Sequence, residues 1–72
     1  MTHIAERCTA TLAAGLADAG ISHRAAGVAV GRSTNYAQRR LTGEVPLTLE
    51  DLEALAAVAG LEVHIELVPA GA

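Results

Sequence analysis

The sequence contains no phenylalanine and no tryptophan, and Tyr36 is its only aromatic residue. The core of this 72-residue chain must therefore be built from leucine, valine, isoleucine and many alanines. A chain this short buries only about 60% of the surface that its unfolded form exposes. Because each alanine side chain buries little area, we expect marginal stability that an association partner would increase.

Long apolar runs and a basic leader segment are also missing. The longest uncharged stretch near the N-terminus, residues 8–17, is about half as long as a membrane span. The sequence shows no basic segment followed by an apolar one, which is the pattern that would indicate secretion. The single Cys8 cannot form an internal disulfide, and we expect it to be a buried structural thiol. These absences predict a cytoplasmic protein.

The chain has few residues that could serve a metal or a catalytic reaction. Cys8 and the three histidines, His3, His23 and His64, do not have the spacing of metal ligands. No glycine-rich phosphate loop follows a strand. We therefore expect no metal, no cofactor and no enzyme activity.

Basic residues are scarce and unevenly placed. The net charge is −3, yet residues 22–43 contain no acidic residue and four of the five basic ones, namely Arg24, Arg32, Arg39 and Arg40. All residues after 43 that carry a formal charge are acidic. A local basic surface on an acidic body suits contact with nucleic-acid phosphates, although a solvated surface without a partner would have the same composition.

Apolar residues recur with helical spacing in the N-terminal segment. Ile4, Cys8, Leu12 and Leu16 follow one another every four residues, which predicts a helix over residues 3–19. Thr2 is suited to cap its start, and residues 20–21 fit a glycine stop followed by an apolar contact.

Three further helices are predicted from capping residues and glycines. Ser22 can begin a helix that continues to Val30, and Ser33 can begin another over Thr34 to Thr42. Residues 48–51 resemble a capping box with aspartate in place of the usual glutamate, and the fourth helix that follows it ends at residue 60.

The C-terminal segment has a different period. Apolar and polar residues alternate from residue 61 to 67, which predicts a half-buried β-strand over residues 62–68 that Pro69 ends. Val63, Ile65 and Leu67 would share one face, and no second strand is available to pair with this one. We therefore expect a homodimer that pairs the two C-terminal strands, unless the segment packs on its own domain and the protein is a monomer. The predicted fold is mainly α: a single domain over residues 1–72 with four helices and one C-terminal strand.

The segment from residue 22 to 43 combines two short helices, a tight turn and small residues. Gly27 lies in the middle of a predicted helix, where glycine costs roughly 1 kcal/mol relative to alanine. We expect this position to allow a close approach of the next helix, as a helix-turn-helix requires. An ordinary helical hairpin is the alternative.

This segment, SHRAAGVAVGRSTNYAQRRLTG, resembles the lambda-repressor-like helix-turn-helix family (Cro/repressor, or Xre). Its capping serines and its glycines match the family pattern without a gap: Ser22, Gly27, Gly31, Ser33 and Gly43. The run RRLTGEVPLTLEDL, residues 39–52, is similar to actinobacterial and actinophage members, and the resemblance covers roughly residues 12–61. His23 replaces a glutamine of the pattern, and the charged Arg40 replaces an apolar residue.

The resemblance implies a four-helix domain that binds operator DNA with its third helix. The positions that match the base-reading residues of the family are Thr34, Asn35, Gln38 and Arg39. Glutamine and asparagine can pair with adenine and arginine with guanine, which agrees with that role. The candidates for phosphate contacts are His23, Arg32, Ser33, Tyr36 and Arg40, although Tyr36 could equally be a core residue.

We expect a sequence-specific transcriptional regulator, most simply a repressor of the bacteriophage Cro or immunity type, acting on the nucleoid. The alternative is a protein-interaction module, such as an antitoxin-like partner protein, that uses the acidic fourth helix and the tail. If the protein binds DNA through its arginines, its affinity for DNA should fall steeply as the salt concentration rises. The alternative predicts no such salt-dependent binding to DNA.

Overall fold

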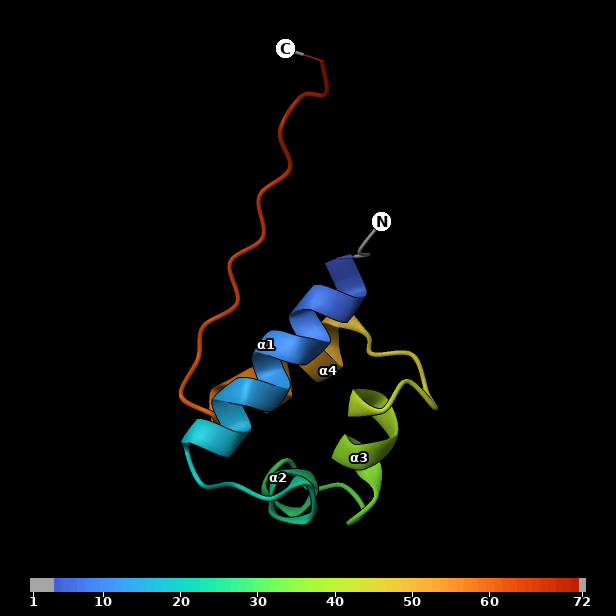
Figure 1. The fold of residues 1–72 in the computed structure, drawn as a ribbon, viewed down its shortest axis with the longest axis vertical. Coiled ribbons are helices and arrows are strands. Elements are labelled where there is room, and N and C mark those ends of the chain that lie inside the picture. Colours follow the sequence, from blue (N-terminus) through green and yellow to red (C-terminus); the bar gives the residue numbers. More distant parts are fainter. Residues whose placement is uncertain (1–3, 72) are drawn as a thin grey trace.

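The computed structural model of the chain describes residues 4–71 and contains four helices in this range (Figure 1). They are α1 (Ile4–Asp18), α2 (His23–Ala29), α3 (Tyr36–Leu41) and α4 (Leu49–Val58). Helix α1 contacts α4 and α3, and α2 contacts α3 and α4. In Figure 1, α1 lies in front of α4, while α2 and α3 are at the end of the domain that is farthest from the C-terminus.

The core lies where the four helices meet, and every helix contributes to it. Leu12, Leu16 and Leu55 are the largest side chains that are fully buried. The remaining buried apolar side chains are Ala26, Tyr36, Ala37, Leu52 and Ala56. Tyr36 is thus the only large ring in a core that otherwise consists of leucine and alanine, which leaves its position in α3 closely constrained by packing.

The predicted helix ends are confirmed where they depend on local hydrogen bonds. The Ser22 hydroxyl accepts a hydrogen bond from the Ala25 amide at 3.1 Å and so caps α2. Thr48 and Asp51 form a reciprocal capping box at the start of α4. The amide of Ile21 donates to the Leu16 carbonyl at 2.9 Å, which closes α1 as predicted. The predicted cap at residue 2 lies outside the described residues.

The third helix is shorter than its predicted range of residues 34–42. It begins at Tyr36, with Asn35 as the N-cap, and ends at Leu41. The carbonyl of Ser33 accepts a hydrogen bond from the Tyr36 amide at 3.1 Å, and the first helical bond joins the Asn35 carbonyl to the Arg39 amide at 3.1 Å. Residues 33–36 therefore form a tight turn, so Ser33 precedes the helix instead of capping it.

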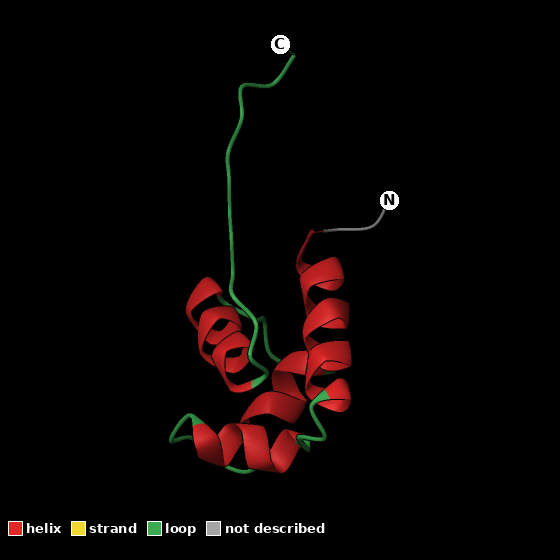
Figure 2. Ribbon diagram, turned by 90° about the vertical axis from the view of Figure 1, so that its left-hand side faces the viewer, coloured by secondary structure: helices red, strands yellow, loops and turns green. Residues whose placement is uncertain are grey.

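The predicted β-strand over residues 62–68 is wrong. Residues 61–69 form an extended segment whose outer part runs away from the helices, and no strand occurs within residues 4–71 (Figure 2). A strand needs a hydrogen-bonded neighbour, and a lone one is not stable by itself. Alternation of apolar and polar residues indicates an extended backbone but does not supply that neighbour.

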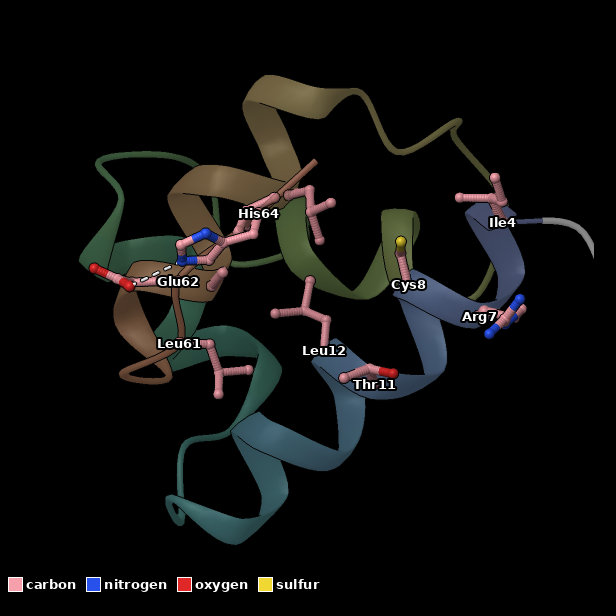
Figure 3. Close-up of a pocket in the computed structure, with 11 residues that line it drawn as sticks. Ile4, Arg7, Cys8, Thr11, Leu12, Leu61, Glu62 and His64 are labelled. Carbon is pink, nitrogen blue, oxygen red and sulfur yellow. Dashed lines mark hydrogen bonds and ion pairs between the residues drawn. The ribbon is translucent and has the colours of Figure 1, made fainter. Parts of the chain in front are cut away.

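The root of this segment packs on the helices, whereas its remainder is exposed. Leu61 lies close to Gly15 of α1, and Val63 is partly buried against the core. Together with side chains of α1 and α4 they border an apolar groove, which Leu12 and Cys8 of α1 also line (Figure 3). Ile65 and Leu67 are 60% and 93% exposed, so only one of the three residues predicted for dimerisation contacts this domain.

No helix within the described residues is both long enough and apolar enough to cross a membrane.

Candidate nucleic-acid interface

Helices α2 and α3 are joined by a tight turn whose geometry depends on two glycines. Gly31 has a φ of +75°, a backbone conformation that suits glycine and ends α2. A Cβ atom at Gly27 would overlap the carbonyl oxygen of Ser33 and would touch Tyr36. The missing side chain at Gly27 therefore allows a close approach to α2, as predicted, although the turn before α3 makes the tightest contact and Tyr36 is the residue of α3 that takes part.

The four residues predicted to read bases are all exposed at the surface formed by the turn and α3. Gln38 and Arg39 project from α3, while Thr34 and Asn35 lie in the turn immediately before it. The side chain of Asn35 makes no capping hydrogen bond. Arg39 lies on the side of the helix opposite the fully buried Ala37, as the helical period requires.

These exposed side chains have no partners within the described part of the chain. No hydrogen bond or ion pair involves the side chains of Gln38 and Arg39 there. They are held in place only through their backbone, on a helix whose opposite face is buried. Their donors and acceptors are thus available to another molecule.

The residues predicted to contact phosphates fall into two groups. Arg32 and Ser33 are exposed in the turn, and His23 is half-buried at the first position of α2. The guanidinium of Arg32 lies 5.4 Å from the centroid of the Tyr36 ring, which is a favourable cation–π distance, and Arg32 as a whole is exposed. Tyr36 and Arg40 instead point towards α4.

Tyr36 is a core residue, which settles the choice that the sequence left open. Its side chain is 5% exposed, and its hydroxyl donates a hydrogen bond to Oδ1 of Asp51. Burial raises the pKa of Tyr36, and the hydrogen bond to the Asp51 carboxylate and its charge raise it further. The hydroxyl therefore stays protonated and acts as a donor to α4.

Arg40 is bound to the same carboxylate. Its Nε donates to Oδ2 of Asp51 at 2.9 Å, its Nη1 donates to the Tyr36 carbonyl at 3.2 Å, and its guanidinium lies 4.1 Å from the Tyr36 ring centroid. The Thr48 amide also donates to Oδ2 of Asp51, at 3.2 Å. We call Tyr36, Arg40 and Asp51 the clamp, because they join α3 to α4.

The clamp keeps a charged carboxylate in a buried place. Asp51 is 8% exposed, and burial by itself raises its pKa, but the hydrogen bonds from Tyr36, Thr48 and Arg40 outweigh this effect and lower the pKa to about 2. Sequence reasoning identified Asp51 only as a capping residue. Two departures from the usual patterns were the available signals for the ion pair between Asp51 and Arg40. The capping box contains an aspartate in place of glutamate, and position 40 is charged where the family pattern has an apolar residue.

Arg24 is a further exposed basic residue that the predicted contact set did not include. It lies on α2 next to His23. The charge count of residues 22–43 could have identified it.

Comparison with known proteins agrees with this arrangement. Residues 6–67 match a family described as a helix-turn-helix domain, and this range contains all four described helices except the first two residues of α1. No curated protein and no solved structure matches the chain significantly. In a helix-turn-helix, the first helix of the motif supports a second one that enters the major groove of DNA. With α2 and α3 in those two places, the chain belongs to the helix-turn-helix domain family of DNA-binding proteins.

Proposed function

We propose that the protein is a sequence-specific transcriptional regulator that acts as a repressor by occupying operator DNA. One observation carries this proposal. Thr34, Asn35, Gln38 and Arg39 expose unpartnered polar groups at one surface of the turn and α3, while the opposite face of α3 is buried in the core. A rigid helix with free donors and acceptors is what reading of base edges requires.

In this proposal each exposed side chain has a definite chemical task. The Arg39 guanidinium presents a planar pair of donors, which fits the O6 and N7 acceptors of guanine. The amides of Gln38 and Asn35 can each donate to N7 and accept from N6 of adenine. Thr34 offers a hydroxyl and a methyl group, the latter suited to the methyl group of thymine.

Phosphate contacts would come from basic and polar residues of α2 and the turn. Arg32, Ser33 and His23 remain in this set, and we add Arg24 because it is exposed on α2. Such contacts fix the position of the domain on the duplex without reading its sequence. Tyr36 and Arg40 are left out, since their polar groups bind Asp51.

The lambda-repressor-like type, with Cro or immunity repressors of actinobacteria and their phages as the nearest analogy, is the finer form of the proposal. It is supported by the ungapped match of Ser22, Ser33 and the glycines to that pattern. The protein would be a non-enzymatic factor of the cytoplasm that acts on the nucleoid.

We also propose that two copies bind together on a palindromic operator. The support is the exposure of Ile65, Leu67 and Val68, at 60%, 93% and 70%, in a chain with a small core. These side chains would gain apolar contacts in a dimer, while two recognition helices roughly 34 Å apart would read half-sites about one turn apart.

The same exposed tail favours a second candidate function, in which the chain is an interaction module for another protein. The test is selection of bound sites from a random pool of duplex DNA, followed by titration of the selected site at several salt concentrations. A repressor yields a defined motif and an affinity that falls steeply with salt. Recovery of a random pool, with no preferred site at low salt, would favour the interaction module.

A further inference from the structure

We infer that Asp51 is a positioning residue for DNA recognition: through the clamp it fixes the orientation of α3 and thereby sets operator preference without touching DNA. This inference rests on the proposed function. Asp51 is the only buried charged residue among those described, and it belongs to α4, outside the helix-turn-helix. Nevertheless, two of the three groups that donate to its carboxylate come from α3.

The clamp holds α3 at both of its ends. Tyr36 is the first residue of this six-residue helix, and Arg40 is the last but one. Their side chains are one helical turn apart and bind different oxygens of the same carboxylate. A helix this short has little stability of its own, so its orientation depends on such contacts. Two attachments on one side of the helix resist its rotation about its axis.

Rotation of α3 is the movement that would impair base reading most. Gln38 lies on the side of α3 opposite Tyr36 and Arg40, because the helical period turns the chain by about 100° per residue. With a helix radius of about 5–6 Å including side chains, a rotation of roughly 15° moves the tip of such a side chain by about 1.5 Å. A hydrogen bond to a base edge does not tolerate a displacement of this size.

The charge of Asp51 provides a test that separates positioning from simple electrostatics. Asp51→Asn makes the protein more positive by one unit, which by itself favours DNA binding. If Asp51 positions α3, the affinity for the operator should fall instead, because the amide of the variant binds Arg40 more weakly and loosens α3. Glu53→Gln is the matched control, since Glu53 is exposed on the same helix and the substitution changes the net charge equally.

The experiment measures the affinity of each full-length protein for the selected operator and for non-operator DNA of equal length. Far-UV circular dichroism is used to choose a temperature at which each variant is fully folded. We expect Asp51→Asn to lower the ratio of the two affinities about tenfold, and Glu53→Gln to leave it unchanged. If Asp51→Asn does not fold, Tyr36→Phe decides, because it keeps the ring and the net charge but removes one clamp bond. A smaller loss of the ratio is expected from it.

A second pair of variants tests whether Arg40 acts inside the protein or on the DNA. Arg32→Met removes a proposed phosphate contact and should reduce the slope of log affinity against log salt concentration by about one unit. Arg40→Met should instead lower the ratio of operator affinity to non-operator affinity and leave that slope unchanged. Loss of slope with Arg40→Met would place that residue on a phosphate and would overturn the assignment.

Hydrogen exchange provides a readout that needs no DNA. Amides of residues 36–41 should exchange faster in Asp51→Asn than in the parent, while those of α1 residues 12–16 should not change. An unchanged affinity ratio together with unchanged exchange in α3 would overturn the inference. A parent that prefers no DNA site would overturn the proposed function, and faster exchange in α3 would then still establish the clamp as the structural attachment of that helix.

Discussion

Arg40 and Asp51 approach each other to 2.9 Å between Nε and Oδ2, across the contact between the third and fourth helices. Both side chains are largely buried, at 21% and 11% exposure, and Tyr36 binds the second carboxylate oxygen. An arginine of the basic segment is thus used within the protein. It neutralises a buried carboxylate, whereas the remaining arginines of that segment, Arg24, Arg32 and Arg39, are exposed.

The lowered pKa of Asp51 makes a contribution to stability that depends on pH. The folded-state pKa of about 2 lies below the ordinary value of 3.8, so the folded protein favours the charged form. This contribution is fully present above about pH 4 and is lost as the pH falls towards 2. We expect it to amount to about 2 kcal/mol in the free energy of unfolding.

Urea denaturation between pH 2 and pH 6 measures this effect. The parent should lose more stability over this interval than Asp51→Asn does, because the variant has no carboxyl group to titrate. Glu53→Gln, which removes an exposed acid from the same helix, should follow the parent. Parallel curves for the parent and Asp51→Asn would show that the carboxylate is not held as described.

A side chain at position 27 should destabilise the domain. Gly27→Leu places atoms where the Ser33 carbonyl lies, and overpacking of this kind typically costs about 1–3 kcal/mol. Ala29→Leu is the matched control, because it adds a leucine at an exposed position of the same helix. Thermal denaturation should show a lower midpoint for the first variant only. Equal midpoints would mean that the turn does not need the close approach.

Removal of a base-reading side chain should alter both affinity and preference. Arg39→Ala or Gln38→Ala should cost about 1–3 kcal/mol on the selected operator and relax the preference at one base pair. Arg7→Ala removes an exposed charge from α1, outside the motif, and should leave the preferred sequence unchanged. Fluorescence anisotropy with a set of single-base operator variants provides the measurement. Identical preferences for Arg39→Ala and the parent would exclude α3 as the reading helix.

Deletion of residues 64–72 tests the exposed tail. The described part of this segment packs little on the helices. At low protein concentration the deletion variant should therefore have the same melting midpoint as the parent. Val63→Ala should lower the midpoint, because Val63 is packed against the core. If the tail joins two copies, sedimentation velocity should show a dimer for the parent at high micromolar concentration and a monomer for the deletion variant. A parent that remains monomeric under these conditions would contradict the proposed dimer.

Much of the helical framework could be predicted because helix ends depend on neighbours in the chain. Ser22 and the pair Thr48 and Asp51 bind amides three residues away, and such bonds follow directly from sequence spacing. Gly27 was also interpreted correctly, since an unfavourable residue in mid-helix indicates that something lies close to it. The start of α3 was misplaced by two residues, because the Ser33 carbonyl takes part in a turn that the capping pattern does not describe.

The amino-acid sequence by itself determined the order of the helices, the close approach at Gly27 and the concentration of arginines between residues 22 and 43. Each of these follows from residue type and local spacing. Only the tertiary structure decided that Tyr36 and Arg40 bind Asp51, 15 and 11 residues further along the chain. It also decided that Val63 of the extended C-terminal segment packs against the core while Ile65 and Leu67 stay exposed. The physical reason is the same in both cases. A buried charge and an extended backbone each need a partner, and which partner is within reach depends on how distant segments pack.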